Sequence, residues 1–195
     1  MRIVLSKGRV ADNFLELLKQ KEIISERPII DRRLTFKIDN YEVLIARSSD
    51  IGEILDGNYA DTAVLGSDVI NEKYQDKYVE LLDLQTGKCF FALAGFPSTD
   101  LDQLKVIATK YPETAKRYLN DLKVKCEIIK KCGSLELYPN IGMCNGIIDI
   151  VESGKTLEAN NLVILRKFEQ VSTRIITTKQ NKNNPEIKIL INRLR

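Results

Sequence analysis

The sequence predicts an α/β protein built from two α/β lobes, and two observations support this prediction. Short apolar runs rich in β-branched residues alternate with helical patterns from the first residue onward, which is the rhythm of mostly parallel sheets covered by helices. The rhythm restarts after Gly87, so we expect residues 1–88 and 171–195 to form one lobe and residues 89–170 to form the other. A cleft between two such lobes is the expected ligand site.

The expected elements of the first lobe are short. Its strands are apolar runs, at residues 2–6, 41–47, 60–66 and 172–179. Its helices show helical apolar spacing or begin at a capping residue, and lie at 10–21, 48–57, 67–74 and from Pro185 onward. We expect Ser67 or Asp68 to cap the third of these helices, and the terminal helix to dock on this lobe.

The second lobe repeats the pattern. Its expected strands are at residues 89–96, 106–111, 126–131 and 146–151, and its expected helices are at 112–123 and 156–165. The last strand and the last helix are separated only by the segment ESGKT (152–156). This segment therefore lies at a strand-to-helix junction.

Composition excludes several classes of function. The sequence has 30 Lys and Arg against 27 Asp and Glu, interspersed along most of the chain, so the dense basic patch of a nucleic-acid-binding protein is missing. Histidine is absent, which excludes Ser-His-Asp and Cys-His catalysis and histidine-rich metal sites. Catalysis must therefore rest on carboxylates, Lys, Arg, hydroxyls and backbone groups.

The sequence also indicates where the protein resides. No run reaches the roughly 18 apolar residues of a membrane span, and the apolar run near the N-terminus, IVL, is too short for a signal-peptide core. The four cysteines contain no CxxC pair, which favours free thiols in a reducing compartment. We expect a cytoplasmic protein that binds neither membranes nor nucleic acid.

The junction at 152–156 has the chemistry of a phosphate site. A strand-to-helix junction directs free backbone N–H groups and the positive end of a helix dipole to one point. Gly154 lets the backbone approach a ligand closely, Ser153 and Thr156 add hydroxyl donors, and Lys155 adds charge. Asp149 and Glu152 are placed to accept hydrogen bonds from a sugar.

This junction has two other interpretations, a nucleotide-binding loop and a purely structural turn. A Walker A loop also ends in Gly-Lys-Thr, but it needs a glycine five positions before Gly154, where this chain has Asp149, so that interpretation is rejected. The other alternative is purely structural: Thr156 caps a helix and Gly154 turns the chain. From these residues alone it stays open.

Further motifs support the phosphate interpretation. They are, in chain order, LSKGR (5–9), DRRL (31–34), RSSDI (47–51), GSDVINE (66–72), ELLDL (80–84), ATKYP (108–112), GSLELYP (133–139) and DIVESGKTLEANNL (149–162). In this order and spacing, the sequence resembles the short form of ATP phosphoribosyltransferase, from residue 5 to about 178. Each motif alone is weak, and their combination is specific.

The resemblance implies an activity and an assembly. The activity is transfer of phosphoribose from 5-phosphoribosyl 1-pyrophosphate to the adenine N1 of ATP, with magnesium, as the first step of histidine biosynthesis. The implied fold has two lobes like those of periplasmic type II binding proteins. The implied partner is a regulatory subunit resembling histidyl-tRNA synthetase in an eight-subunit complex, with a homodimer formed by this chain alone. The long form adds a C-terminal regulatory domain, which we do not expect in a chain of this length.

The resemblance also implies roles for particular residues, while no residue is assigned directly to a metal. The residues that look like ligands of 5-phosphoribosyl 1-pyrophosphate are Glu136 and Asp149 for the ribose hydroxyls and Glu152, Ser153, Gly154, Lys155 and Thr156 for the 5-phosphate. The residues implied for ATP are Lys7, Arg9 and Asp68, and those implied for catalysis, through the charge of the pyrophosphate, are Arg9 and Arg32. For Lys7 and Arg47 a solvated surface role is an equal alternative.

Two departures from the family pattern have consequences. The family usually has Gly-Leu-Ala-Asp ahead of the strand that leads to the phosphate loop, whereas this chain has Asn145 in place of the acid. If that acid orients ribose or metal, this chain binds them differently. Ala63 replaces a frequent glycine, at little expected cost. The alternative from another class of protein is a non-catalytic module that binds a small anion or a nucleotide on the same fold.

Overall fold

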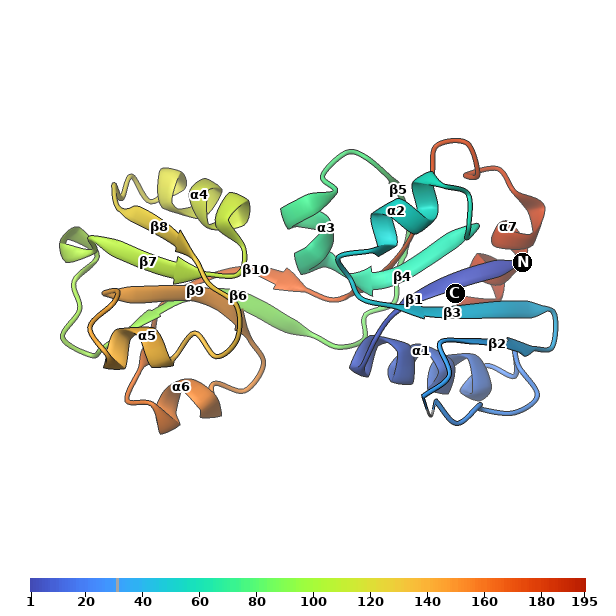
Figure 1. The fold of residues 1–195 in the computed structure, drawn as a ribbon, viewed down its shortest axis with the longest axis horizontal. Coiled ribbons are helices and arrows are strands. Elements are labelled where there is room, and N and C mark those ends of the chain that lie inside the picture. Colours follow the sequence, from blue (N-terminus) through green and yellow to red (C-terminus); the bar gives the residue numbers. More distant parts are fainter. Residues whose placement is uncertain (31) are drawn as a thin grey trace. The chain divides into compact units, whose positions relative to one another are not determined.

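The computed structural model describes residues 1–30 and 32–195. The chain forms two compact units, and Figure 1 shows the elements of each. Unit 1 comprises Met1–Gly87 and Ser172–Arg195, and unit 2 comprises Lys88–Val171. The chain passes from unit 1 to unit 2 after Gly87 and returns after Val171.

In the described part of unit 1, six strands form one mixed sheet in the order β2-β3-β1-β4-β11-β5. The strands are β1 (Arg2–Ser6), β2 (Thr35–Ile38), β3 (Tyr41–Ala46), β4 (Thr62–Gly66), β5 (Val79–Asp83) and β11 (Thr173–Thr177). The central strand β1 pairs in parallel with β3 and β4, while β2, β11 and β5 join antiparallel. The carboxyl ends of β1, β3 and β4 therefore meet at one edge of this sheet.

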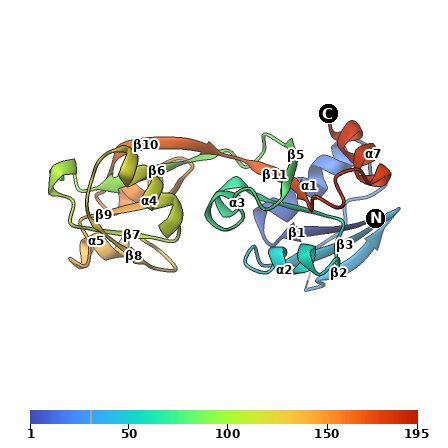
Figure 2. The same cartoon turned by 90° about the horizontal axis from the view of Figure 1, so that it is seen from above.

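Helices cover both faces of the unit 1 sheet. They are α1 (Arg9–Gln20), α2 (Ile51–Asp56), α3 (Ser67–Lys73) and α7 (Pro185–Leu194). The buried side chains of α1 and α7 pack with those of Ile3, Leu5 and Val64 on one face, whereas α2 packs with Val4 and Ala63 on the other. Figure 2 shows α1 and α7 on one side of this sheet and α2 on the other. The terminal helix thus docks on unit 1, as predicted.

Unit 2, all of whose residues are described, has a five-stranded mixed sheet in the order β10-β6-β9-β7-β8. The strands are β6 (Cys89–Gly95), β7 (Val106–Thr109), β8 (Glu127–Lys130), β9 (Gly146–Val151) and β10 (Val163–Val171). Strand β7 pairs in parallel with β8 and β9, and β6 pairs antiparallel with β9 and β10. The carboxyl ends of β7, β8 and β9 share one edge.

The helices of unit 2 divide between the two faces of its sheet, as Figure 1 shows. They are α4 (Pro112–Asp121), α5 (Leu137–Asn140) and α6 (Lys155–Ala159), and a 3-10 turn spans Leu101–Gln103. Helix α4 packs through Tyr118 and Leu119 on the face that carries Ile148. The opposite face carries Ala108, Ile147 and Val151 and packs against the segments around α5 and α6.

The fold confirms the two-lobe α/β prediction and corrects four details. The sheets are mixed rather than mostly parallel, because five strands make only antiparallel pairings, namely β2, β5, β6, β10 and β11. Three of the strands, β2, β5 and β10, were not expected. The expected helix at 156–165 is wrong, since α6 ends at Ala159 and β10 begins at Val163. Gly66, rather than Ser67 or Asp68, occupies the N-cap of α3.

Two further features of the chain are the state of its cysteines and the character of its helices. The four cysteines, Cys89, Cys126, Cys132 and Cys144, are free thiols, as predicted. Among the described helices, none combines the length and the apolar character needed to cross a bilayer.

Candidate active site

The alternation of side chains along β9 directs Asp149 toward the face that carries α5 and α6. Ile147, Asp149 and Val151 share this face because they are two residues apart in a strand, and Ile147 and Val151 pack in the core beside Leu157 of α6. Within this apolar surrounding the side chain of Asp149 keeps only 13% of its exposure. A carboxylate held there needs hydrogen-bond partners or a cation to stay charged.

Lys110 supplies that cation from the neighbouring strand. Its Nζ lies 3.2 Å from Oδ2 of Asp149, and the Ile150 N–H donates to Oδ1 of Asp149 at 2.9 Å. Lys110 follows the last residue of β7, which lies parallel to β9 with Thr109 opposite Ile148. The parallel register therefore brings Lys110 and Asp149 together at the carboxyl edge of the sheet.

Glu136 adds a second carboxylate to this edge, immediately before α5. Burial raises the pKa of Asp149 above its ordinary value, the ammonium of Lys110 and the N–H of Ile150 oppose that rise, and the charge of Glu136 adds to it. Two carboxylates and one ammonium thus stand near one another in unit 2. Such a set can accept hydrogen bonds from vicinal hydroxyls of a sugar.

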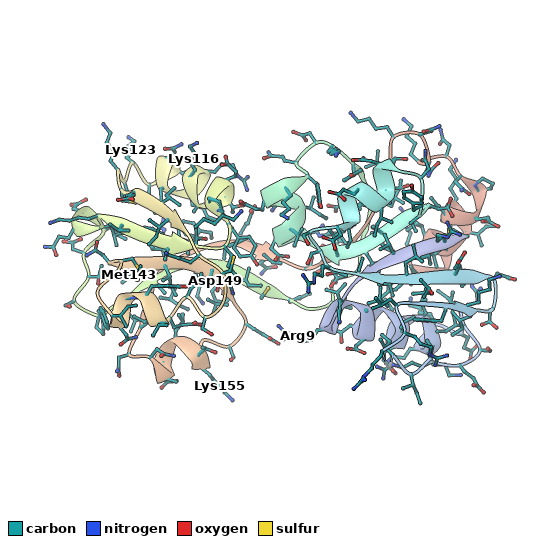
Figure 3. The ribbon with its side chains drawn as sticks, in the orientation of Figure 1. Arg9, Lys116, Lys123, Met143, Asp149 and Lys155 are labelled. Atoms are coloured by element: carbon teal, nitrogen blue, oxygen red, sulfur yellow. The ribbon has the colours of Figure 1, made fainter. Side chains whose placement is uncertain are left out.

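The turn that follows β9 presents its backbone to solvent. Gly154 adopts a left-handed conformation, with φ of 78°, and forms the N-cap of α6. A Cβ placed on Gly154 would meet open space, and Ser153, Lys155 and Thr156 are exposed. The side chain of Lys155 projects away from the sheet in Figure 3. The N–H groups at the start of α6 are thus available to an anion.

The structural alternative for this turn is correct in one respect and wrong in another. Gly154 does turn the chain, but Thr156 lies inside the first turn of α6 and is not its cap. Its carbonyl accepts a hydrogen bond from Nδ2 of Asn160 at 2.8 Å, and Leu157 anchors α6 in the core. Glu152 is exposed, just ahead of the turn. The anchored helix fixes the turn while its N-terminal hydroxyls stay at the surface.

In unit 1, three of the predicted residues stand at the carboxyl edge of the sheet. Lys7 follows β1 and is exposed, and Arg9 is the exposed first residue of α1. Asp68 begins α3 directly after β4 and is buried, at 8% exposure. Gly8, at φ of 95°, turns the chain between Lys7 and Arg9, so a left-handed glycine separates the two cations.

The predicted residue Arg32 is exposed and belongs to the irregular segment before β2. Asp31, the first residue of the DRRL motif, lies outside the described residues. Arg47, at the end of β3, is also exposed. Within unit 1, Arg47 therefore shares the carboxyl edge with Lys7.

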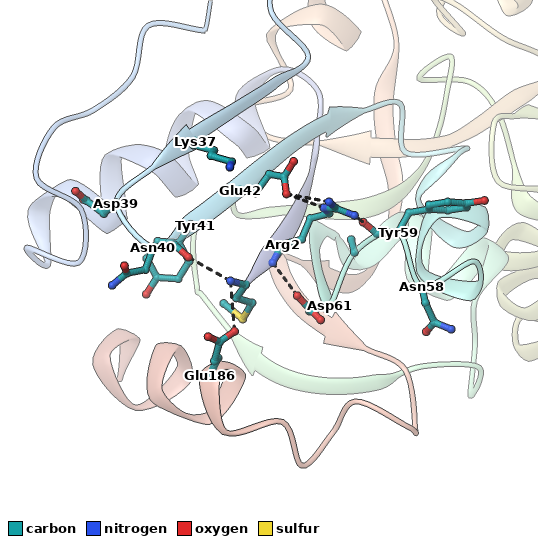
Figure 4. Close-up of a pocket in the computed structure, with 12 residues that line it drawn as sticks. Arg2, Lys37, Asp39, Asn40, Tyr41, Glu42, Asn58, Tyr59, Asp61 and Glu186 are labelled. Carbon is teal, nitrogen blue, oxygen red and sulfur yellow. Dashed lines mark hydrogen bonds and ion pairs between the residues drawn. The ribbon is translucent and has the colours of Figure 1, made fainter.

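A polar pocket of about 500 Å³ opens at the opposite, amino edge of the unit 1 sheet, and Figure 4 shows its lining. Its charged groups bind one another: Arg2 contacts Glu42 at 2.9 Å, and the backbone N–H of Arg2 donates to Asp61 at 2.7 Å. None of the residues predicted for substrate binding lines it. In open α/β sheets ligands bind at the carboxyl ends of the strands, so this pocket is not the candidate site.

The sequence patterns assigned no role to Lys110, although Lys110 lies in the motif ATKYP. The available signal was its position directly after an apolar strand, where parallel strands place polar side chains together. Sequence reasoning also left the role of Asn145 open. Oδ1 of Asn145 accepts hydrogen bonds from the backbone N–H groups of Lys105 and Val106, at the amino edge of the unit 2 sheet. Asn145 is thus separated from the edge that carries Asp149.

Comparison with known proteins identifies the family. The family model described as ATP phosphoribosyltransferase matches residues 47–195. The chain is 38% identical to ATP phosphoribosyltransferase of Lactococcus lactis subsp. cremoris over 92% of this chain and 88% of that protein. It is 36% identical to the enzyme of that name from Staphylococcus epidermidis over 100% of this chain and 96% of that protein.

Solved structures agree with this assignment. The ATP phosphoribosyl transferase (HisG:HisZ) complex from Thermotoga maritima matches with a TM-score of 0.82 and 27% identity, over 100% of this chain and 96% of that chain. The periplasmic VFT2 domain of Bordetella pertussis BvgS matches with a TM-score of 0.62 and 12% identity, over 100% and 93%, which shows the fold alone and confirms the predicted fold class. By its sequence and its structure, the chain belongs to the ATP phosphoribosyltransferase family.

Proposed function

We propose that this chain transfers phosphoribose from 5-phosphoribosyl 1-pyrophosphate to N1 of the adenine of ATP, the first step of histidine biosynthesis. A bond forms between N1 and the anomeric carbon, and the bond from that carbon to pyrophosphate breaks, leaving its electron pair on pyrophosphate. Family membership over residues 47–195 carries this proposal. The grouping of carboxylates and a phosphate-type turn at one sheet edge of unit 2 supports it.

Unit 2 is the proposed binding unit for 5-phosphoribosyl 1-pyrophosphate. The exposed turn around Gly154 offers N–H groups and the hydroxyls of Ser153 and Thr156 to the 5-phosphate, and Lys155 adds a positive charge. Asp149 and Glu136 accept hydrogen bonds from the ribose hydroxyls. Glu152, between the strand and the turn, completes the loop.

Unit 1 is the proposed nucleotide unit. Lys7 and Arg9 offer two cations to the phosphates of ATP at the carboxyl edge of β1, and Asp68 offers an acceptor at the edge of β4. Arg9 and Arg32 would neutralise charge on the departing pyrophosphate. Adenine N1 is unprotonated at neutral pH, so the reaction depends on alignment and charge neutralisation more than on a strong base. This requirement suits a chain without histidine.

Magnesium is the proposed divalent ion. The carboxylates of Glu136 and Asp149 fit such an ion, because magnesium takes oxygen ligands and often combines one or two carboxylates with substrate phosphates. When bound, the ion would offset negative charge on the pyrophosphate. Among the described residues, no group of three or more His, Cys, Asp or Glu side chains is arranged to hold a metal.

A regulatory partner is the proposed context for this activity. The Thermotoga maritima relative was solved as a HisG:HisZ complex. By analogy, this chain would work with a regulatory subunit resembling histidyl-tRNA synthetase, in an eight-subunit cytoplasmic complex, and would form a homodimer alone.

An activity assay tests the proposal. The chain is mixed with ATP, 5-phosphoribosyl 1-pyrophosphate and magnesium, with and without the regulatory subunit, and adenine alkylation is followed by absorbance and by product mass. We expect product that depends on both substrates. Absence of product in both arms would overturn the proposal, and ligand binding without turnover would favour the non-catalytic binding module instead.

A further inference from the structure

The contact between Lys110 and Asp149 is placed to act on substrate. Lys110 keeps 38% of its side-chain exposure while Asp149 keeps 13%, so the cation stands at the surface above a largely buried carboxylate. We infer that Lys110 is a positioning residue for 5-phosphoribosyl 1-pyrophosphate: its ammonium holds the carboxylate of Asp149 in the orientation that accepts the ribose hydroxyls. This inference rests on the proposed function of unit 2.

The backbone on both sides of Lys110 is held firmly. The buried hydroxyl of Thr109 donates to the carbonyl of Ile148 at 2.7 Å and accepts the N–H of Tyr111 at 3.0 Å. The ring of Tyr111 packs edge-on against Phe91, with 5.1 Å between centroids. Lys110 therefore projects from a fixed junction between β7 and α4, and β7 is the parallel neighbour of the strand that carries Asp149. A pre-organised cation loses little freedom when substrate binds.

The charges around Asp149 need Lys110 in order to balance. Asp149 faces Lys110 from the end of β7 and Glu136 from the segment before α5, and its own strand contributes the Ile150 N–H. Oδ1 of Asp149 is held by the Ile150 N–H and Oδ2 by Lys110, so each oxygen has a contact that fixes its direction. Removal of the ammonium releases Oδ2 and weakens the site without touching the substrate-binding turn.

A surface ion pair would behave differently. Exposed pairs contribute little to stability and are screened by salt. Here one partner is largely buried, so loss of the cation leaves a carboxylate in an apolar face with the Ile150 N–H as its donor. The expected consequence lies in ligand affinity, and an arginine at this position should reverse it.

Calorimetry with 5-phosphoribosyl 1-pyrophosphate and magnesium at pH 7 tests the inference on the full chain. Lys110→Met should weaken binding by about tenfold. Lys110→Arg should restore most of the affinity. Lys116→Met, which removes an exposed lysine from α4 on the opposite face (Figure 3), is the control and should bind like wild type.

The outcomes separate this inference from the proposed function. Wild-type chain that fails to bind 5-phosphoribosyl 1-pyrophosphate overturns both. Wild-type binding that Lys110→Met leaves unchanged in affinity overturns the inference alone. A Lys110→Met variant that unfolds at lower temperature, but binds with wild-type affinity when folded, also overturns it, because Lys110 would then be structural only.

Discussion

Asn145 and Val106 share two hydrogen bonds. The backbone N–H of Asn145 donates to the carbonyl of Val106 at 2.9 Å, and the N–H of Val106 donates back to the side-chain Oδ1 of Asn145 at 3.1 Å. The same Oδ1 also accepts the N–H of Lys105. This side chain therefore ties the start of β7 to the start of β9.

Asn145→Ala should destabilise unit 2 and leave substrate binding unchanged. The change removes the acceptor of two backbone N–H groups and should lower the free energy of unfolding by about 1 kcal/mol. Asn145→Asp keeps an acceptor oxygen and should cost less. Urea unfolding and calorimetry with 5-phosphoribosyl 1-pyrophosphate measure the two effects. Weakened binding in a fully stable Asn145→Ala variant would show instead that this position serves the ligand.

Gly154→Ala should impair binding of the 5-phosphate more than its strain alone explains. Alanine at φ of 78° costs about 1 kcal/mol, and relief of that strain would rotate the N–H groups of the turn. Gly142 is a matched control, since its φ is 73° and a Cβ there also meets open space. Both variants should lose similar stability, while only Gly154→Ala should raise the Kd for 5-phosphoribosyl 1-pyrophosphate. Equal Kd values would remove the turn from the binding site.

The sequence was sufficient for elements whose pattern is local. The run GIIDIV at 146–151 is apolar except for Asp149, and it forms β9 at those residues. The segment TLEANNLVIL contains apolar residues at helical spacing and no proline or glycine, which explains the wrong helix prediction. Asn161, with φ of 59°, breaks the chain direction there, and β10 forms because β6 offers it an edge. The pairing with β6 is a tertiary contact, so the sequence TLEANNLVIL itself contains no signal for it.

In the candidate site, too, residues that are adjacent in sequence could be predicted, and a contact between distant residues could not. Asp149 and the turn at 152–156 are adjacent in sequence, so one motif revealed both. Lys110 is 39 residues away from Asp149, and the two meet only because β7 and β9 are parallel neighbours in a particular register. Strand order of this kind depends on the whole sheet. A motif search within one segment cannot supply it.

Asp149→Asn should lose ligand affinity and retain or gain stability at pH 7. Burial raises the folded-state pKa of Asp149 above its ordinary 3.8, so the ionised carboxylate is costly in the folded protein once the pH exceeds the folded value. Asparagine avoids this cost. The stability advantage of the variant should shrink as the pH falls through the raised folded-state pKa and should disappear below 3.8, where the wild-type carboxyl becomes protonated in both states.

Urea unfolding across that pH range measures the stability change, and calorimetry at pH 7 measures affinity, which should fall about tenfold or more. A variant that is less stable than wild type at pH 7, by an amount that grows with pH, would contradict this assignment of the carboxylate.

Arg32→Ala should lower turnover far more than it weakens binding of 5-phosphoribosyl 1-pyrophosphate. Negative charge on the pyrophosphate increases as the bond to the anomeric carbon breaks, so a guanidinium that neutralises it acts chiefly in the transition state. Loss of such a group typically costs about 100-fold in kcat. Arg33→Ala removes the same charge one residue away, from a side chain that is equally exposed, and should leave kcat near wild type. Steady-state kinetics with both substrates decides, because an unchanged kcat in Arg32→Ala, or an equal loss in both variants, would exclude a specific role for Arg32.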